Sequence, residues 1–129
     1  MEDADSSKQQ AARDWRRALW KSRRGRISFQ VLSEFYVNAV RKQPSARDAL
    51  RAEVRDLMAW SPIPTDAALL EQAWKVQDRF HFSFWDALIV AAAKAASCRH
   101  LLTEDLQDGQ TLEGIEVVNP FLHGPSSIL

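Results

Sequence analysis

Three acidic residues that lie far apart in the sequence occupy positions where their charge could be used for chemistry. Glu34 lies in the apolar segment VLSEFYV, Asp86 opens the segment WDALIVAAA, and Asp105 follows the apolar run HLLT. Carboxylate oxygens are the hard ligands that Mg²⁺ and Mn²⁺ prefer, with water completing the coordination. Acids at strand ends and at a helix N-terminus can converge on one pocket. A divalent-cation site is therefore one candidate use of these three acids.

Each of the three acids also has a purely structural interpretation, which the residues alone leave open. Asp86 suits the role of capping and dipole partner of its own helix. Glu34 can extend from the edge of a helix into solvent. Asp105 can be a residue of a solvated turn, because the segment TEDLQDG that contains it is polar and is closed by Gly109.

The other reactive side chains form no recognisable motif. His81, His100 and His123 have no metal-ligand spacing, and we expect them to be surface or packing residues. Cys98 is the single cysteine, which excludes an internal disulfide and a cysteine-based zinc site and fits a reducing cytoplasm.

Charge is unevenly distributed although the net charge is zero. The stretch from Lys8 to Arg26 is strongly basic, whereas residues 101–129 contain acids and no lysine or arginine. A basic stretch indicates either a phosphate-binding surface or the solvated face of a helix. The arginines of this stretch are Arg13, Arg16, Arg17, Arg23, Arg24 and Arg26.

The elements that must position these side chains are predicted by hydrophobic periodicity. Helical spacing occurs over residues 7–22, in VLSEFYVNAV, and on either side of SPIPTD. Ser45 with Asp48 and Ser83 with Asp86 have the spacing of N-terminal capping pairs. The helix that begins near Ser83 is apolar on nearly every side, so we expect it to be buried.

Short strands are predicted between and after these helices. RISFQV is either a strand or the lead-in to a helix, and SPIPTD is an edge strand or an extended loop because of its prolines. HLLT and IEVV are strands separated by the acidic turn. The alternation predicts an α/β fold of three layers, α/β/α, with a short parallel sheet. With 129 residues, we expect a single domain over residues 1–129.

Residues 82–121 resemble the C-terminal half of a PIN domain, in particular that of the ribonuclease toxins of VapBC-type toxin–antitoxin pairs. The segments WDALIVAAA, LLTEDLQDG and VVNPF occur in the order and spacing of that family. The segment ISFQVLSEFYV further resembles the family segment that carries an acidic ligand on a helix. The resemblance extends over nearly the whole chain and implies a PIN-like fold.

The resemblance also implies which residues form the site. Glu34, Asp86 and Asp105 would be the catalytic and metal-binding acids, and Thr103 would be a supporting hydroxyl. Asp108 and Glu104 match no family ligand as firmly, so we expect them to be turn residues.

The function implied by the resemblance is that of a metal-dependent endoribonuclease. Mg²⁺ or Mn²⁺ would be the cofactor, RNA the substrate, an antitoxin protein the partner, and a homodimer the expected assembly. The six arginines would contact RNA phosphates. We expect a soluble cytoplasmic protein, because MEDADSSKQQ is no secretory signal and the longest apolar stretch is too short to span a membrane.

Two other classes of function are alternatives to the nuclease. A PIN-like protein with impaired catalysis could act as an interaction module that dimerises or binds an antitoxin. A DNA-binding repressor would use the basic N-terminal helix, but no helix-turn-helix spacing supports it.

One family feature has no match in the sequence. A PIN domain usually begins with an apolar strand that ends in Asp, followed by Thr or Ser and then Asn, and this strand lies in the middle of the sheet. Only MEDADSSKQQ precedes the first predicted helix. We therefore expect a fold that lacks its N-terminal central strand and one acidic ligand, and a weakened activity. A start codon placed too late and a degraded remnant both explain this, and the three intact acids favour the late start.

Overall fold

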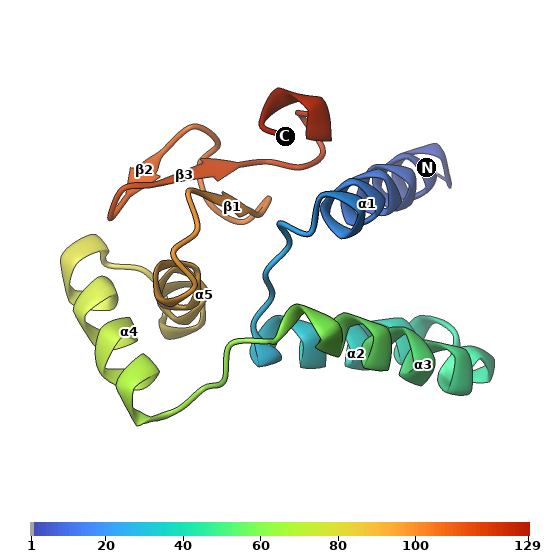
Figure 1. The fold of residues 1–129 in the computed structure, drawn as a ribbon, viewed down its shortest axis with the longest axis horizontal. Helices are drawn as coiled ribbons and strands as arrows, with labels where there is room; N and C mark the ends of the chain where they lie inside the picture. The colour runs from blue at the N-terminus through green and yellow to red at the C-terminus, as the bar shows by residue number, and fades with distance from the viewer. Residues whose placement is uncertain (1) are drawn as a thin grey trace. The chain divides into compact units, whose positions relative to one another are not determined.

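Helices come first along the chain and strands follow, as the computed structural model shows for residues 2–129 (Figure 1). The elements in order are α1 (Glu2–Ser22), α2 (Phe29–Lys42), the 3-10 turn η1 (Pro44–Ala46), α3 (Arg47–Leu57), the 3-10 turn η2 (Met58–Trp60), α4 (Ala67–Phe80), α5 (Phe84–Ala95), β1 (His100–Leu102), β2 (Thr111–Leu112), β3 (Ile115–Val118) and the 3-10 turn η3 (Pro125–Ser127). The chain divides into two compact units. The first comprises the chain up to Gly25 together with Arg99–Leu129, and the second comprises Arg26–Cys98.

The second unit begins with an extended segment that leads directly into α2. Ser28 is the N-cap of this helix, and its hydroxyl accepts a hydrogen bond of 3.1 Å from the Val31 amide. Ser28 also forms an isolated parallel bridge with Ile63. Of the two predicted alternatives, RISFQV is therefore the lead-in to a helix, and SPIPTD is extended chain that pairs with it at one position.

The two predicted capping pairs have different outcomes. Ser83 is the N-cap of α5, and its hydroxyl accepts a 3.2 Å hydrogen bond from the Asp86 amide, as predicted. The prediction for Ser45 is wrong, because α3 starts after Ala46 with no side-chain cap. Pro44, whose backbone is already restricted to helical φ, starts a 3-10 turn there, so Ser45 lies inside a turn rather than at its beginning.

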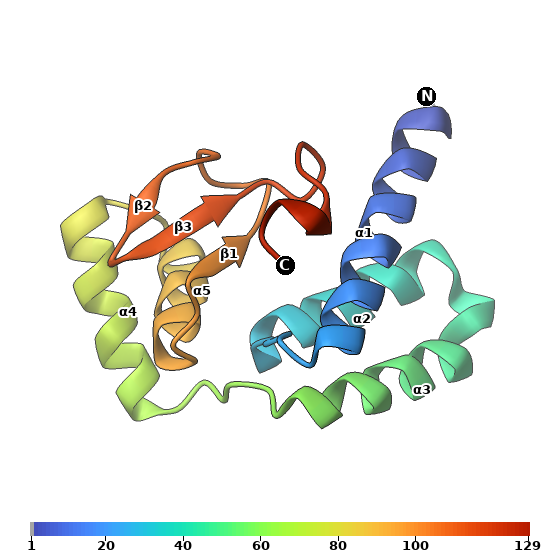
Figure 2. The same ribbon diagram turned by 45° about the horizontal axis from the view of Figure 1, so that its top comes forward.

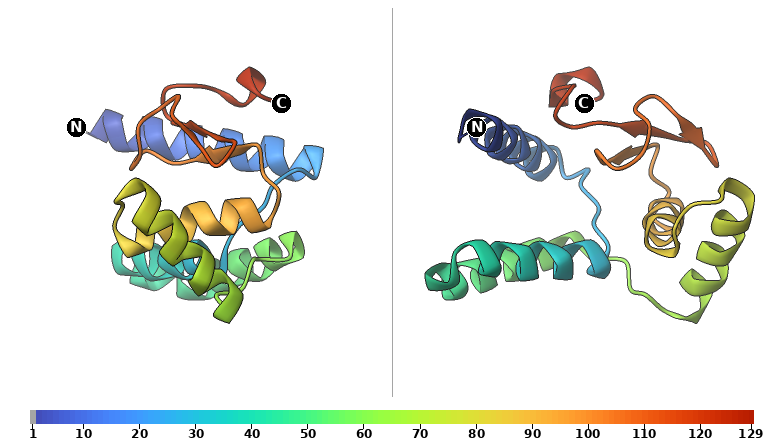
Figure 3. Two further views of the ribbon diagram at one scale, coloured as in Figure 1. Left: turned by 90° about the vertical axis from the view of Figure 1, so that its left-hand side faces the viewer. Right: turned by 180° about the vertical axis from the view of Figure 1, so that it is seen from behind.

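The pair α4 and α5 forms the hydrophobic core of the second unit (Figure 3). This core consists of Leu69 and Ala73 from α4 and Leu88, Ala91 and Ala92 from α5. Ala73 is fully buried, and a small side chain at this position lets the two helices approach closely. The prediction that the alanine-rich helix is buried is confirmed.

The first unit contains a three-stranded sheet in which β3 lies between β1 and β2 (Figure 2). β1 and β3 are parallel, with Leu101 opposite Val117, so the predicted adjacency of HLLT and IEVV is confirmed. β2 was not predicted, and it pairs antiparallel with β3. Glu113 and Gly114, both with positive φ, join β2 to β3 in a two-residue hairpin turn. The protein thus has the predicted α/β character, with a mixed rather than purely parallel sheet.

The same unit includes α1, which packs against the C-terminal end of the chain. Trp15 is only 3% exposed, and it contacts the segment that follows β3. Over residues 2–129, no helix combines the length and the apolar character that a membrane span needs.

Candidate active site

The acidic loop, residues 103–110, follows β1 and carries one of the predicted ligands. The Thr103 amide donates a 3.1 Å hydrogen bond to the Val118 carbonyl, which extends the pairing of β1 with β3 into the start of the loop. The Thr103 hydroxyl accepts a 3.1 Å hydrogen bond from the Asp105 amide. This bond fixes the backbone of Asp105 just beyond the carboxyl end of the strand and leaves its carboxylate exposed. A supporting contact from Thr103 to Asp105 is therefore present.

Asp86 lies in the first turn of α5, where its amide is bound by the capping hydroxyl of Ser83. Its side chain is half-buried. A carboxylate in the first turn is stabilised by the positive end of the helix dipole. The same preorganised position also suits a metal ligand, so the geometry is compatible with both interpretations of Asp86.

Glu34 lies on an exposed face of α2, and its carboxylate accepts a 3.1 Å hydrogen bond from Gln30 Nε2. The apolar neighbours of Glu34 in the sequence indicate a position near the core, and this expectation is wrong. Leu32 is 2% exposed and faces the core, and a step of two residues along an α-helix places Glu34 on roughly the opposite side.

The donor chemistry of the three predicted acids fits Mg²⁺ or Mn²⁺, since all their ligand atoms would be carboxylate oxygens. Glu34 and Asp86 belong to the second unit and Asp105 to the first. Among the side chains of residues 6–129, no three His, Cys, Asp or Glu residues form a group that could hold a metal ion. The shared pocket of these three acids therefore stays a prediction.

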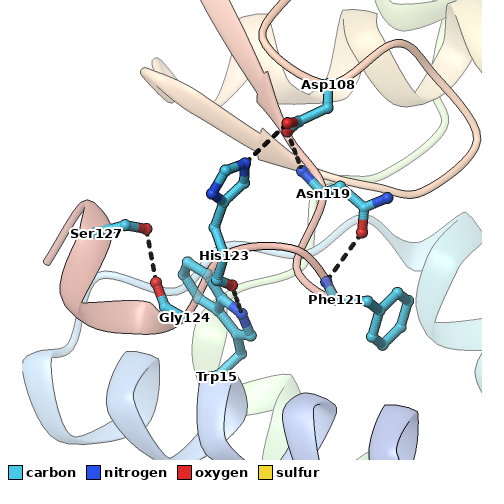
Figure 4. Close-up of polar contacts among 7 residues, drawn as sticks. All are labelled: Trp15, Asp108, Asn119, Phe121, His123, Gly124 and Ser127. Atoms are coloured by element: carbon cyan, nitrogen blue, oxygen red, sulfur yellow. Dashed lines mark hydrogen bonds and ion pairs between the residues drawn. The ribbon is translucent and has the colours of Figure 1, made fainter. Parts of the chain in front are cut away.

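Asp108 and Glu104 were expected to be solvated turn residues, but each forms a specific contact with another part of the chain. Glu104 forms a 2.9 Å ion pair with Lys8 of α1. Asp108 accepts a 2.8 Å hydrogen bond from the Asn119 amide and lies 2.8 Å from Nε2 of His123 (Figure 4). The hydrogen bond from the Asn119 amide, followed by that from His123, lowers the pKa of the Asp108 carboxyl.

The histidines are also less isolated than their spacing indicated. His123 pairs with Asp108, and His100 of β1 lies 3.5 Å from the carboxylate of Glu116 on β3. His81 is exposed at the C-terminal end of α4, with φ of 59°. No pattern in the sequence could have predicted the partner of His123, because the partners are connected only by the folded sheet.

The predicted phosphate-binding arginines lie mainly on the surface of the first unit. Arg16 is half-buried on α1, and the others are exposed. Arg26 is the first residue of the second unit, while the remaining five lie on or directly after α1. Their exposure is compatible with phosphate contacts and equally with a solvated helix face.

Comparison with known families identifies the fold. The family model for the PIN domain matches residues 4–107, which is most of the chain. The chain belongs to the PIN domain family. This match includes Glu34, Asp86 and Asp105, and PIN domains are a nuclease-type family that generally depends on divalent metal ions. No curated protein matched the sequence.

Proposed function

We propose that this PIN domain is a metal-dependent endoribonuclease and the toxin component of a toxin–antitoxin pair of the VapBC type. The observation that carries the proposal is the family match over residues 4–107. It is supported by the acidic loop, where the Thr103 hydroxyl holds the backbone of Asp105 at the end of a parallel strand. The carboxyl ends of parallel strands are where α/β proteins commonly place their ligands.

In this proposal Glu34, Asp86 and Asp105 hold Mg²⁺ or Mn²⁺ and are the catalytic residues. The bound cation would polarise the scissile phosphate of RNA and lower the pKa of an attacking water. The chain's own contribution is to hold the backbone of these acids in place. The Ser83 hydroxyl accepts a hydrogen bond from the Asp86 amide, and the Thr103 hydroxyl accepts one from the Asp105 amide. Exposed arginines of α1 would bind the flanking phosphates.

A cleavage assay with labelled RNA tests this function. We expect cleavage in Mg²⁺ or Mn²⁺, none in EDTA, and a loss of at least about 100-fold in Asp86→Asn. Asp78→Asn is the matched control, because Asp78 is an exposed acid on α4 of the same unit and no part of the predicted site. Equal cleavage by the wild type and Asp86→Asn, or an equal loss in Asp78→Asn, would contradict the proposal.

We further propose that the chain as printed is a poor nuclease because the family's first strand and its terminal Asp have no match in it. In the described residues β1 is paired by β3 alone, so the other side of β1 could receive a further strand. The test compares the printed chain with a form extended by an apolar strand that ends in Asp-Thr-Asn. We expect the extended form to cleave RNA faster. Equal rates in the two forms would show that the strand is not needed.

A second candidate function, an interaction module with impaired catalysis, is favoured by exposed apolar side chains. Trp85 is 61% exposed and Val37 is 52% exposed, both in the second unit. In a homodimer, or in a complex with an antitoxin protein, such side chains would be buried. Sedimentation velocity tests the homodimer, and we expect Trp85→Ser to shift the protein toward monomer. A wild-type monomer at all concentrations would contradict the homodimer, and RNA cleavage as fast as that of the extended form would exclude impaired catalysis.

A further inference from the structure

A short turn after β3, residues 119–124, makes contacts on two sides within the first unit; we call it the C-terminal turn (Figure 4). On one side it binds the acidic loop through Asp108. One carboxylate oxygen accepts from the Asn119 amide, and the other lies 2.8 Å from His123 Nε2. Both oxygens of Asp108 are therefore directed at the C-terminal turn.

On the other side the C-terminal turn binds α1. The indole N–H of Trp15 is shared between the carbonyls of Pro120, at 2.9 Å, and His123, at 3.0 Å. The turn is also fixed internally, because Asn119 Oδ1 accepts a 2.9 Å hydrogen bond from the Phe121 amide. Lys8 of α1 adds a cation–π contact, 5.2 Å from the centre of the Phe121 ring. The C-terminal turn is thus bound to α1 on one side and to the acidic loop on the other.

The ends of the acidic loop are bound to β3 by backbone hydrogen bonds, and near its start Glu104 also forms a 2.9 Å ion pair with Lys8 of α1. Thr103 is bound at the start of the loop to Val118, and Gly109 is bound near its end to Val117 by a 2.8 Å hydrogen bond. Asp108 adds a side-chain anchor three residues after Asp105. A metal ligand must be held within about 0.5 Å of its productive position by the residues around it.

We propose that Asp108 is a positioning residue for Asp105, and that the C-terminal turn is a clamp that holds the acidic loop in the conformation in which Asp105 serves the site. The proposal rests on the proposed function only for the role of Asp105. The clamp itself is a statement about the order of the loop. Trp15 and His123 make the contacts of the C-terminal turn with α1 and with the acidic loop, so they belong to the clamp.

The test measures loop order and cleavage in parallel on the full chain. Backbone order parameters from ¹⁵N relaxation are recorded for residues 103–110 in the wild type, Asp108→Ala, His123→Ala and Trp15→Phe. We expect values for the loop of about 0.85 in the wild type and below about 0.6 in Asp108→Ala. RNA cleavage should fall by about tenfold or more in that variant.

Two comparisons separate positioning from a general loss of stability. Asp108→Asn keeps an acceptor for the Asn119 amide, so we expect it to restore most of the loop order and most of the cleavage. His100→Ala is the matched control, because it removes another histidine–carboxylate contact of the same unit without touching the acidic loop. It should leave the order of the loop unchanged.

The outcomes also separate this inference from the proposed function. If the wild type cleaves no RNA, the nuclease proposal fails, and the order parameters still decide whether the clamp exists. If Asp108→Ala leaves the loop as ordered as in the wild type, the clamp is overturned even where RNA is cleaved. If His100→Ala loosens the loop as much as Asp108→Ala does, the effect is general destabilisation and Asp108 has no positioning role. If Asp108→Ala does not fold, the order parameters of the loop in His123→Ala decide whether the clamp exists.

Discussion

At the scale of single residues, the contacts of Asp108 make stability depend on pH. The hydrogen bond from the Asn119 amide, and then that from His123, place the pKa of Asp108 below its ordinary value in the folded chain. A carboxylate with a lowered folded pKa stabilises the fold above its unfolded pKa of about 4, and this contribution is lost as the pH falls through the folded pKa.

We therefore expect Asp108→Asn to lower the melting temperature at neutral pH. The substitution removes the carboxylate charge of Asp108, which strengthens the hydrogen bonds from the Asn119 amide and from His123. The difference from the wild type should shrink as the pH falls from about 4, the unfolded pKa, through the lower pKa of Asp108 in the folded chain. Thermal melts of both proteins over this range give the measurement. A difference that is constant down to the lowest pH would mean that the charge of Asp108 does not stabilise the fold.

The residue scale also shows why part of the site could be predicted and part could not. The contact of Asp86 with Ser83 spans three residues, so the capping pattern indicated it, whereas Thr103 was indicated by the family resemblance. The partner of Trp15 lies 105 residues away, and only the folded chain joins them. Periodicity indicates which side of a helix or strand is apolar, but it does not indicate which loop packs against that side.

At the scale of elements, the two serines that were predicted to cap helices allow the effect of a capping hydroxyl on stability to be measured. Ser83→Ala should destabilise the protein by about 1 kcal/mol, because the Asp86 amide loses its acceptor at the start of α5. Ser45→Ala should leave stability unchanged, since neither η1 nor α3 has a side-chain cap. Urea unfolding of both variants checks this. Equal losses would show that the hydroxyl of Ser83 contributes nothing specific.

The hairpin of β2 and β3 provides a second comparison between similar residues. Gly114 has φ of +81° in the turn, a conformation that costs an L-residue about 1–2 kcal/mol. Gly124 has φ of −85°, and a Cβ would meet no atom within 4 Å at either glycine. We expect Gly114→Ala to be destabilising and Gly124→Ala to be neutral or slightly stabilising. Denaturant melts that rank the two variants in the opposite order would contradict the assigned turn.

Element types were largely predictable because most helices carry their own periodic signal. β2 escaped prediction because it is two residues long, and it exists only through its pairing with β3. The start of α3 was misplaced for a related reason, since the geometry of Pro44 outweighed the capping pattern of Ser45. Where two start signals for a helix compete, backbone geometry decides between them. A pattern of residue types does not specify that geometry.

At the scale of the whole molecule, the uneven charge makes a prediction about RNA binding. A triple variant replaces Arg13, Arg17 and Arg24 with Gln. We expect this variant to bind single-stranded RNA more weakly than the wild type does. The slope of log affinity against log salt should become shallower by about 2. The same change at Arg41, Arg47 and Arg55, which are exposed in the second unit, is the matched control and should leave the slope unchanged. Identical slopes in all three proteins would exclude α1 as a phosphate-binding surface.

The first unit is assembled from the two ends of the chain, and this has a consequence for biosynthesis. The second unit is continuous in sequence, so a ribosome delivers all of it before the strands of the first unit are made. Trp15 leaves the ribosome 105 residues ahead of Pro120, which is about 5 to 20 s at ordinary rates of translation. During that interval Trp15 lacks the two carbonyls that its indole binds in the folded unit, so its side chain is accessible to chaperones. The acidic loop can be clamped only after residues 119–124 have been made, so a nascent chain has the residues of α4 and α5 before it has those of the clamp.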